Sequence, residues 1–214
     1  VFVYSETFEE AFGNGDDYAA KVGSTISHES GHGYGLGHHS DVSASTGSVL
    51  DEYSNGEATW TPIMGANKST DRTIWLEPLR LVVRDGVPVH IRGTDDLALL
   101  STALGYRSDE HGDAPSAGTP MHPTASPLSS ANPVLTGAGI IHRVSERDSF
   151  RFTLAASGFV RIVLKPADIG ANLDGILVFG RYTSTSTTVL SRADPSNDLG
   201  AAVSMSLEPG EYYV

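Results

Sequence analysis

The chain has 214 residues, of which 39% are hydrophobic and 19% charged, a composition typical of one large or two small globular domains. Its formal net charge of −12, with only three lysines, argues against a nucleic-acid or anionic-membrane partner, because phosphate binding needs concentrated Lys and Arg. The lack of cysteine excludes a thiolate nucleophile or metal ligand, and no apolar run reaches the ~20 residues that span a bilayer.

The first predicted elements are a short apolar strand over residues 1–4 and, after a Gly/Asp loop, a helix over about residues 18–33. Because the strand-like run starts at Val1 and a natural start is Met, we expect a fragment or a processed form. Gly31 and Gly33 each weaken the helix by about 1 kcal/mol relative to Ala. We therefore expect this helix to depend on packing and on a bound metal.

The end of this helix carries a candidate metal site, since residues 28–38 read HESGHGYGLGH. His28 and His32 leave the same helix face one turn apart and can bind one ion. Glu29 lies too far round the helix to join them, but it can reach a water at the metal as a general base. Gly35 lets the chain leave the helix, which brings back His38 as a third nitrogen ligand. Three protein ligands leave zinc an open position, as in catalytic sites.

Two alternatives bear on this motif. A bare H-E-x-x-H arises by chance in many helices, but here five fixed positions match over eleven residues. His39 directly follows His38 and could compete with it as a ligand. Only His38 has the spacing of the motif, so we interpret His39 as a residue at the rim of the site or just behind the ligands.

The full pattern H-E-x-x-H-x-x-G-x-x-H resembles the zinc signature of the metzincin metallopeptidases. The resemblance implies zinc bound by the three histidines and a tight turn with a methionine beneath them. Residues 61–65 read TPIMG and fit that turn, in which Met64 provides a soft apolar floor for the imidazoles. The alternative for Met64 is an ordinary core position. Some metzincins carry a tyrosine shortly after this turn, but Ala66, Asn67 and Lys68 follow here, so that role stays unassigned.

The next predicted elements are a loop over residues 40–60 and a hairpin over 79–92 around Asp85-Gly86, with Pro88 confining its arm to a sheet edge. Thr94 can cap a helix that begins at Asp95 and Asp96, and Gly105 stops it. The metzincin resemblance implies a helix in this place, after the methionine turn. It also implies upstream strands, which are mostly missing ahead of Val1.

Residues 111–137 are rich in proline, serine and threonine and predict a stiff, extended linker without a core. Two acidic clusters, Asp16-Asp17 and Asp109-Glu110-Asp113, are candidate ligands for Ca²⁺, which prefers carboxylate oxygens. The alternative is that they are solvated loop acids.

From residue 138 the hydrophobic period becomes two, and several short strands predict a β-sandwich. Its expected core is Phe150, Phe152, Leu154, Val160, Ile162, Leu164, Ile176, Val178, Val203, Met205 and Leu207. The segment resembles the bacterial pre-peptidase C-terminal domain. The resemblance is carried by the opening Asp148-x-Phe150-x-Phe152, the step Leu173-Asp174 and the closing Leu207-x-Pro209-Gly210-x-Tyr212-Tyr213-Val214.

These resemblances together imply an α+β metzincin-like catalytic domain over residues 1–110, N-terminally incomplete, a linker over 111–137, and an all-β sandwich over 138–214, C-terminally truncated. They imply a secreted, extracellular zinc-dependent endopeptidase with Glu29 as general base and a protein or peptide as substrate. One alternative is a catalytically weak zinc-binding adhesion or matrix module of a secreted bacterial protein. Others are a zinc hydrolase of non-peptide amides and a calcium- or carbohydrate-binding protein with an accidental motif.

Overall fold

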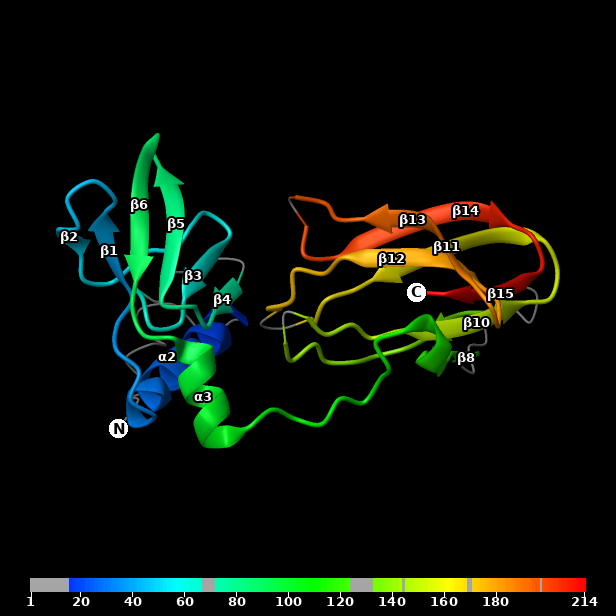
Figure 1. Cartoon of the computed structure of the whole chain (residues 1–214), viewed down its shortest axis with the longest axis horizontal. Helices are drawn as coiled ribbons and strands as arrows, with labels where there is room; N and C mark the ends of the chain where they lie inside the picture. Colours follow the sequence, from blue (N-terminus) through cyan, green and yellow to red (C-terminus); the bar gives the residue numbers. More distant parts are fainter. Residues whose placement is uncertain (1–15, 67–71, 124–132, 144, 169–170, 197) are drawn as a thin grey trace. The chain divides into compact units, whose positions relative to one another are not determined.

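The computed structural model describes residues 16–66, 72–123, 133–143, 145–168, 171–196 and 198–214 (Figure 1). The described part is a mixed α+β structure, mostly strands with two α-helices. The chain divides into two compact units, the first of Val1–Tyr106 with Ala167–Asn172 and the second of Arg107–Pro166 with Leu173–Val214. The strand expected over residues 1–4 lies outside the described residues. Within the described chain, neither helix is both long enough and apolar enough to cross a membrane.

Helix α2 (Asp16–Gly33) has a buried face that follows the helical period, with Lys21, Ser24, His28 and Gly31 turned inward. The chain leaves the helix through a turn at Gly35, whose φ of +88° favours glycine. Two backbone bonds close the end, from Gly35 N–H to His32 O (3.0 Å) and from Leu36 N–H to Gly31 O (3.0 Å). This pair of bonds is a Schellman motif, and it turns the chain back along the helix.

A four-stranded antiparallel sheet follows, in the order β2-β1-β6-β5. Its strands are β1 (Ser40–Ser43), β2 (Val49–Asp51), β5 (Leu79–Arg84) and β6 (Val87–Arg92). The predicted hairpin is confirmed, and both Asp85 (φ 51°) and Gly86 (φ 78°) are in the left-handed conformation that two-residue hairpin loops require. The expectation that Pro88 confines its arm to an edge is wrong, because β6 lies between β1 and β5. The pairing with β1 stops at Val89, one residue short of Pro88, so the missing N–H is not needed.

Two further elements complete the first unit. The short parallel pair β3 (Trp60–Pro62) and β4 (Arg72–Ile74) flanks the turn that contains Met64. Helix α3 (Asp96–Leu104) was expected with Thr94 as its cap, but Asp95 is the N-cap and accepts from Ala98 N–H, while Gly105 ends the helix as predicted. One buried cluster of this unit is formed by Trp60, Leu76, Val82, Val89 and Ile91.

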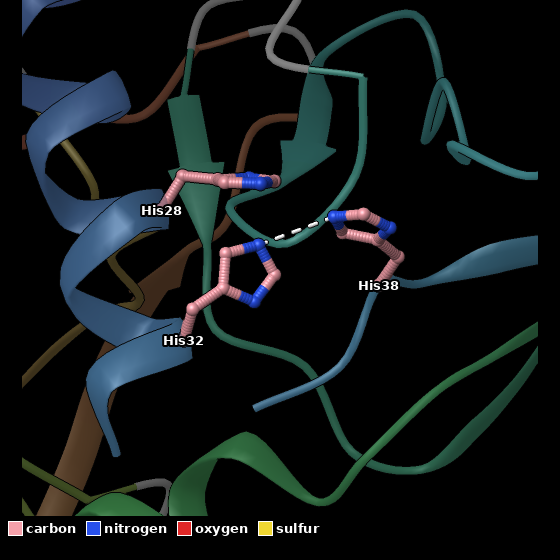
Figure 2. Close-up of side chains that lie close together, drawn as sticks. All are labelled: His28, His32 and His38. Atoms are coloured by element: carbon pink, nitrogen blue, oxygen red, sulfur yellow. Dashed lines mark hydrogen bonds between the residues drawn. The ribbon is translucent and has the colours of Figure 1, made fainter. Parts of the chain in front are cut away.

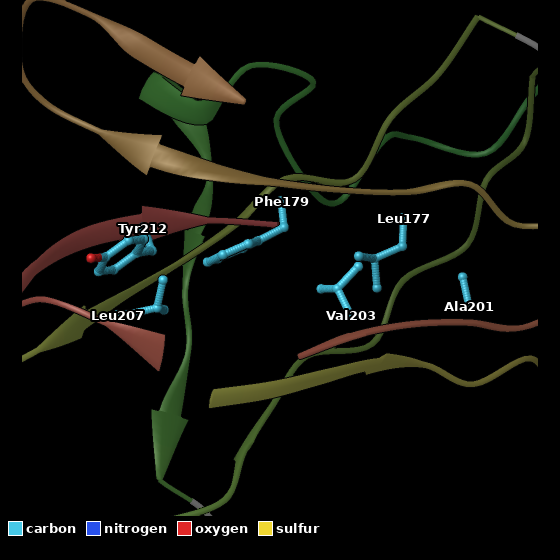
Figure 3. Close-up of a cluster of buried hydrophobic side chains, with 6 residues drawn as sticks. All are labelled: Leu177, Phe179, Ala201, Val203, Leu207 and Tyr212. Carbon is cyan, nitrogen blue, oxygen red and sulfur yellow. The ribbon is translucent and has the colours of Figure 1, made fainter. Parts of the chain in front are cut away.

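The second unit contains a five-stranded sheet in the order β13-β12-β15-β10-β7 and a two-stranded sheet of β11 and β14. The strands are β7 (Thr119–Pro120), β10 (Phe150–Leu154), β11 (Gly158–Leu164), β12 (Leu177–Tyr182), β13 (Thr187–Ala193), β14 (Ala201–Leu207) and β15 (Gly210–Tyr213). Both sheets contribute to one core, shown in Figure 3, which is compatible with the predicted sandwich. Its buried members are Leu177, Phe179, Ala201, Val203, Leu207 and Tyr212.

Two expectations about this unit need correction. In β12 the core residues are Leu177 and Phe179, whereas the predicted Ile176 is 51% exposed and Val178 is only half-buried. Phe150, also predicted in the core, packs on the His111 ring instead.

The described part of 111–137, predicted as a linker, belongs to this unit, because β7 joins the five-stranded sheet and a 3₁₀ turn (Pro115–Ala117) precedes it. A small pair of strands, β8 (His122–Pro123) and β9 (Leu135–Thr136), also forms there.

Candidate metal centre

Three histidine rings converge at the end of α2. His28 and His32 come from the helix and His38 comes from the chain that returns after Gly35 (Figure 2). One nitrogen of each ring lies within 4.8 Å of the others, and Nε2 of His38 is 3.2 Å from Nε2 of His32. Tetrahedral zinc, with Zn–N bonds of about 2.0–2.1 Å, places its nitrogen ligands about 3.3 Å apart. The pair of His32 and His38 has this spacing, and the three residues together could hold a metal ion.

Backbone carbonyls hold the two helical histidines through Nδ1, so that Nε2 of each ring is the candidate ligand atom. His28 Nδ1–H donates to Ile63 O (2.7 Å), and His32 Nδ1–H donates to Leu36 O (2.9 Å). A carbonyl oxygen can only accept, so each bond fixes the ring tautomer that leaves Nε2 with its lone pair. Backbone acceptors of this kind commonly orient metal-binding histidines.

The third histidine has different neighbours. Nδ1 of His38 lies 3.7 Å from Glu52 Oε1, and its ring packs on Tyr53 with ring centroids 4.3 Å apart. Burial lowers the pKa of His38 below its ordinary value, and the nearby rings of His32 and His28 lower it further, against a smaller opposing effect of Glu52. Metal binding needs the neutral imidazole, so this environment favours the ligating form.

Met64 lies beneath the helix that carries the first two histidines. It is fully buried, in a cluster with Leu36 and Ile63. A Cβ added at Gly31 would come within 2.7 Å of Met64 Sδ, so only glycine allows this approach. The turn is closed by Gly65 N–H donating to Pro62 O (2.9 Å).

Gly65 has no positive φ and is needed for space, since a Cβ there would lie 2.4 Å from Ser54 O. Glu29, the residue expected to act as general base, follows His28 on α2 and is half-buried.

Comparison with known proteins found no matching family model, no matching curated protein and no matching solved structure. The resemblance to metzincins thus rests on the sequence motif alone.

One pair of residues in this region was not predicted. His39 is fully buried, which is wrong for the expected rim position and agrees with the other expected position, behind the candidate ligands; its Nε2–H donates to the buried carboxylate of Asp96 (3.0 Å). The sequence places these residues 57 positions apart. Nothing in the local spacing links them.

A second unpredicted feature is the segment of Glu52 and Tyr53, which the sequence assigned to a loop. Ser54, the residue that follows, forms backbone hydrogen bonds with two segments of the candidate metal centre. Ser54 N–H donates to His39 O (2.6 Å), and Ser54 O accepts from Ala66 N–H (2.9 Å) just after the methionine turn. These bonds bring a carboxylate and a phenol beside His38, although neither has a recognisable motif.

Of the carboxylates expected to bind calcium, two accept hydrogen bonds from backbone groups and two lie outside the described part of the structure. Asp109 Oδ1 accepts from His111 N–H (3.0 Å), and Asp113 Oδ1 accepts from Arg147 N–H (2.9 Å), so both carboxylates cap backbone groups. The side chains of Asp16 and Asp17 lie outside the described part. Among the described residues, the three histidines form the one group with at least three potential ligand atoms within reach of a single ion.

Proposed function

We propose that this chain is a zinc-dependent endopeptidase. The observation that carries the proposal is the histidine triad, in which His28 and His32 are oriented by backbone bonds at Nδ1 and His38 Nε2 lies 3.2 Å from His32 Nε2. All three ligands come from the protein, which leaves a fourth position for water and substrate. Glu29 on the same helix turn and Met64 beneath it complete the resemblance to metzincins.

A zinc ion bound by these histidines supplies a Lewis acid that polarises the scissile carbonyl and activates water. Glu29 takes a proton from the attacking water as a new C–O bond forms at the peptide carbonyl. The same carboxyl then returns the proton to the amine nitrogen as the C–N bond breaks. The backbone acceptors on His28 and His32 keep their nitrogens in place during both steps.

The test is cleavage of casein and of a mixed peptide library by the longest soluble form of the protein. We expect cleavage that stops with a chelator and returns when zinc is added back. The competing function is a zinc-binding adhesion or matrix module. It predicts the same zinc uptake without cleavage of any peptide, an outcome that would overturn the proposed activity.

A further inference from the structure

The carboxylate of Asp96 joins three segments around the metal centre. It is fully buried at the start of α3, and its Oδ2 accepts from His39 Nε2–H (3.0 Å) and from Leu76 N–H (3.0 Å). Its Oδ1 accepts from the Thr94 hydroxyl (3.0 Å), whose oxygen accepts from Gly37 N–H (3.3 Å). Asp96 thus holds both sides of the short loop that carries the third metal ligand.

The neighbouring residue of that loop points away from the metal. The ring of His39 lies on Gly93, where a Cβ would come within 2.4 Å of Nδ1. His38, one residue earlier, faces His32 on the opposite side. Because successive side chains of an extended chain leave opposite faces, fixing His39 inward directs His38 outward, toward the other ligands.

The stability of the fold alone does not account for this buried pair. Two buried polar side chains add little net stability compared with apolar side chains of the same volume. What the pair does provide is a defined direction for the loop, since both side chains are fully buried and the bond from His39 Nε2–H to the Asp96 carboxylate joins them.

We propose that His39 and Asp96 are positioning residues for the metal centre, which act through His38 and touch neither metal nor substrate. This inference rests on the proposed zinc site. Outer partners of metal ligands commonly change metal affinity 10–100-fold when they are removed. We expect a change of this size when the bond is broken.

The experiment titrates cobalt(II) into the full chain and follows its visible absorption, which reports the ligand geometry directly. His39→Leu removes the bond, Asp96→Asn removes the charge of its acceptor, and His39→Gln keeps an N–H donor near the position of Nε2. Val82→Ala, in the core cluster around Trp60, is the matched control for loss of stability alone. Melting of each metal-free protein is measured alongside.

We expect His39→Leu to bind cobalt roughly 10–100-fold more weakly than Val82→Ala at comparable metal-free stability, with an altered spectrum, and His39→Gln to recover most of the affinity. Equal affinity and an unchanged spectrum in His39→Leu would overturn the inference and leave the zinc site intact. A parent chain that binds no cobalt would instead overturn the proposed function itself. Should Asp96→Asn not fold, the two His39 variants decide the matter.

Discussion

The sulfur of Met64 lies against the backbone of Gly31, so closely that a Cβ at Gly31 would come within 2.7 Å of it. Gly31 immediately precedes the candidate ligand His32, and the residue before Met64 provides the carbonyl that holds His28. One contact therefore couples the methionine turn to both histidines of the helix.

Gly31→Ala tests this contact. The new methyl group meets Met64, which is fully buried and has little room to move, so we expect a loss of about 1–3 kcal/mol in stability, only partly offset by better helix propensity. Gly23→Ala is the matched control, because nothing lies within 4 Å of its Cβ, and it should gain up to about 1 kcal/mol. Urea unfolding of both metal-free proteins measures the difference. Equal stability of the two variants would mean that the helix and the turn are not in contact.

Glu52→Gln tests the orientation of the third ligand. The Glu52 carboxylate lies 3.7 Å from His38 Nδ1, but its side chain is 73% exposed, so we expect a loss of less than about tenfold in zinc affinity. Competition with a chelating dye provides the measurement. Glu77→Gln, an exposed residue of the same unit, removes the same charge. If both variants lose the same affinity, the effect comes from net charge and not from contact with His38.

The helix and its two histidines follow from the sequence because both depend on local periodicity. The turn at Gly35 is equally local. The bond between His39 and Asp96 is not, since it forms only when α3 packs beside the ligand loop. The positions of Glu52 and Tyr53 depend in the same way on bonds between distant backbone segments.

The strands of the second unit were predictable from their alternation, but the inward face of β12 was not. Residues 176–179 are Ile, Leu, Val and Phe, so every position is apolar and no alternation indicates which side faces the core. Packing of Leu177 and Phe179 against Tyr212 settles this face, with the rings of Phe179 and Tyr212 stacked at 5.7 Å.

A pair of carboxylates in the second unit predicts opposite responses to pH. Hydrogen bonds from the ring and backbone N–H of His142 lower the pKa of Glu146, so its contribution to stability is present above the unfolded pKa of about 4.3 and is lost as pH falls through the lower folded value. Burial raises the pKa of Asp148, with Glu110 adding to the shift and His111 opposing it. Its contribution is present below the unfolded pKa of about 3.9 and is lost as pH rises through the higher folded value.

Glu146→Gln should therefore lower the melting temperature at pH 7, and Asp148→Asn should raise it. Both differences should shrink as the pH approaches 3. Scanning calorimetry of the full chain at several pH values provides the measurement. A melting temperature that Asp148→Asn lowers at pH 7 would contradict the expected sign.

We expect the second unit to need residues 107–137 for its stability, although the sequence predicts a linker over 111–137. Residues 107–137 provide β7 to the five-stranded sheet and the His111 ring that packs on Phe150. We expect a fragment of residues 107–214 to unfold cooperatively and a fragment of 138–214 to melt at a lower temperature. Circular dichroism of the two fragments measures this. Identical melting would show that the segment adds nothing to the fold.

The most direct test of the proposed activity is the rate of peptide cleavage per bound zinc in the parent and in Glu29→Gln. The substitution keeps the size of the side chain and leaves the three histidines in place, but removes the group that accepts the proton. We predict one zinc per chain in both proteins and a loss of at least about 100-fold in cleavage by the variant. Zinc-loaded Glu29→Gln that cleaves as fast as the parent would contradict the role of Glu29 and the mechanism built on it.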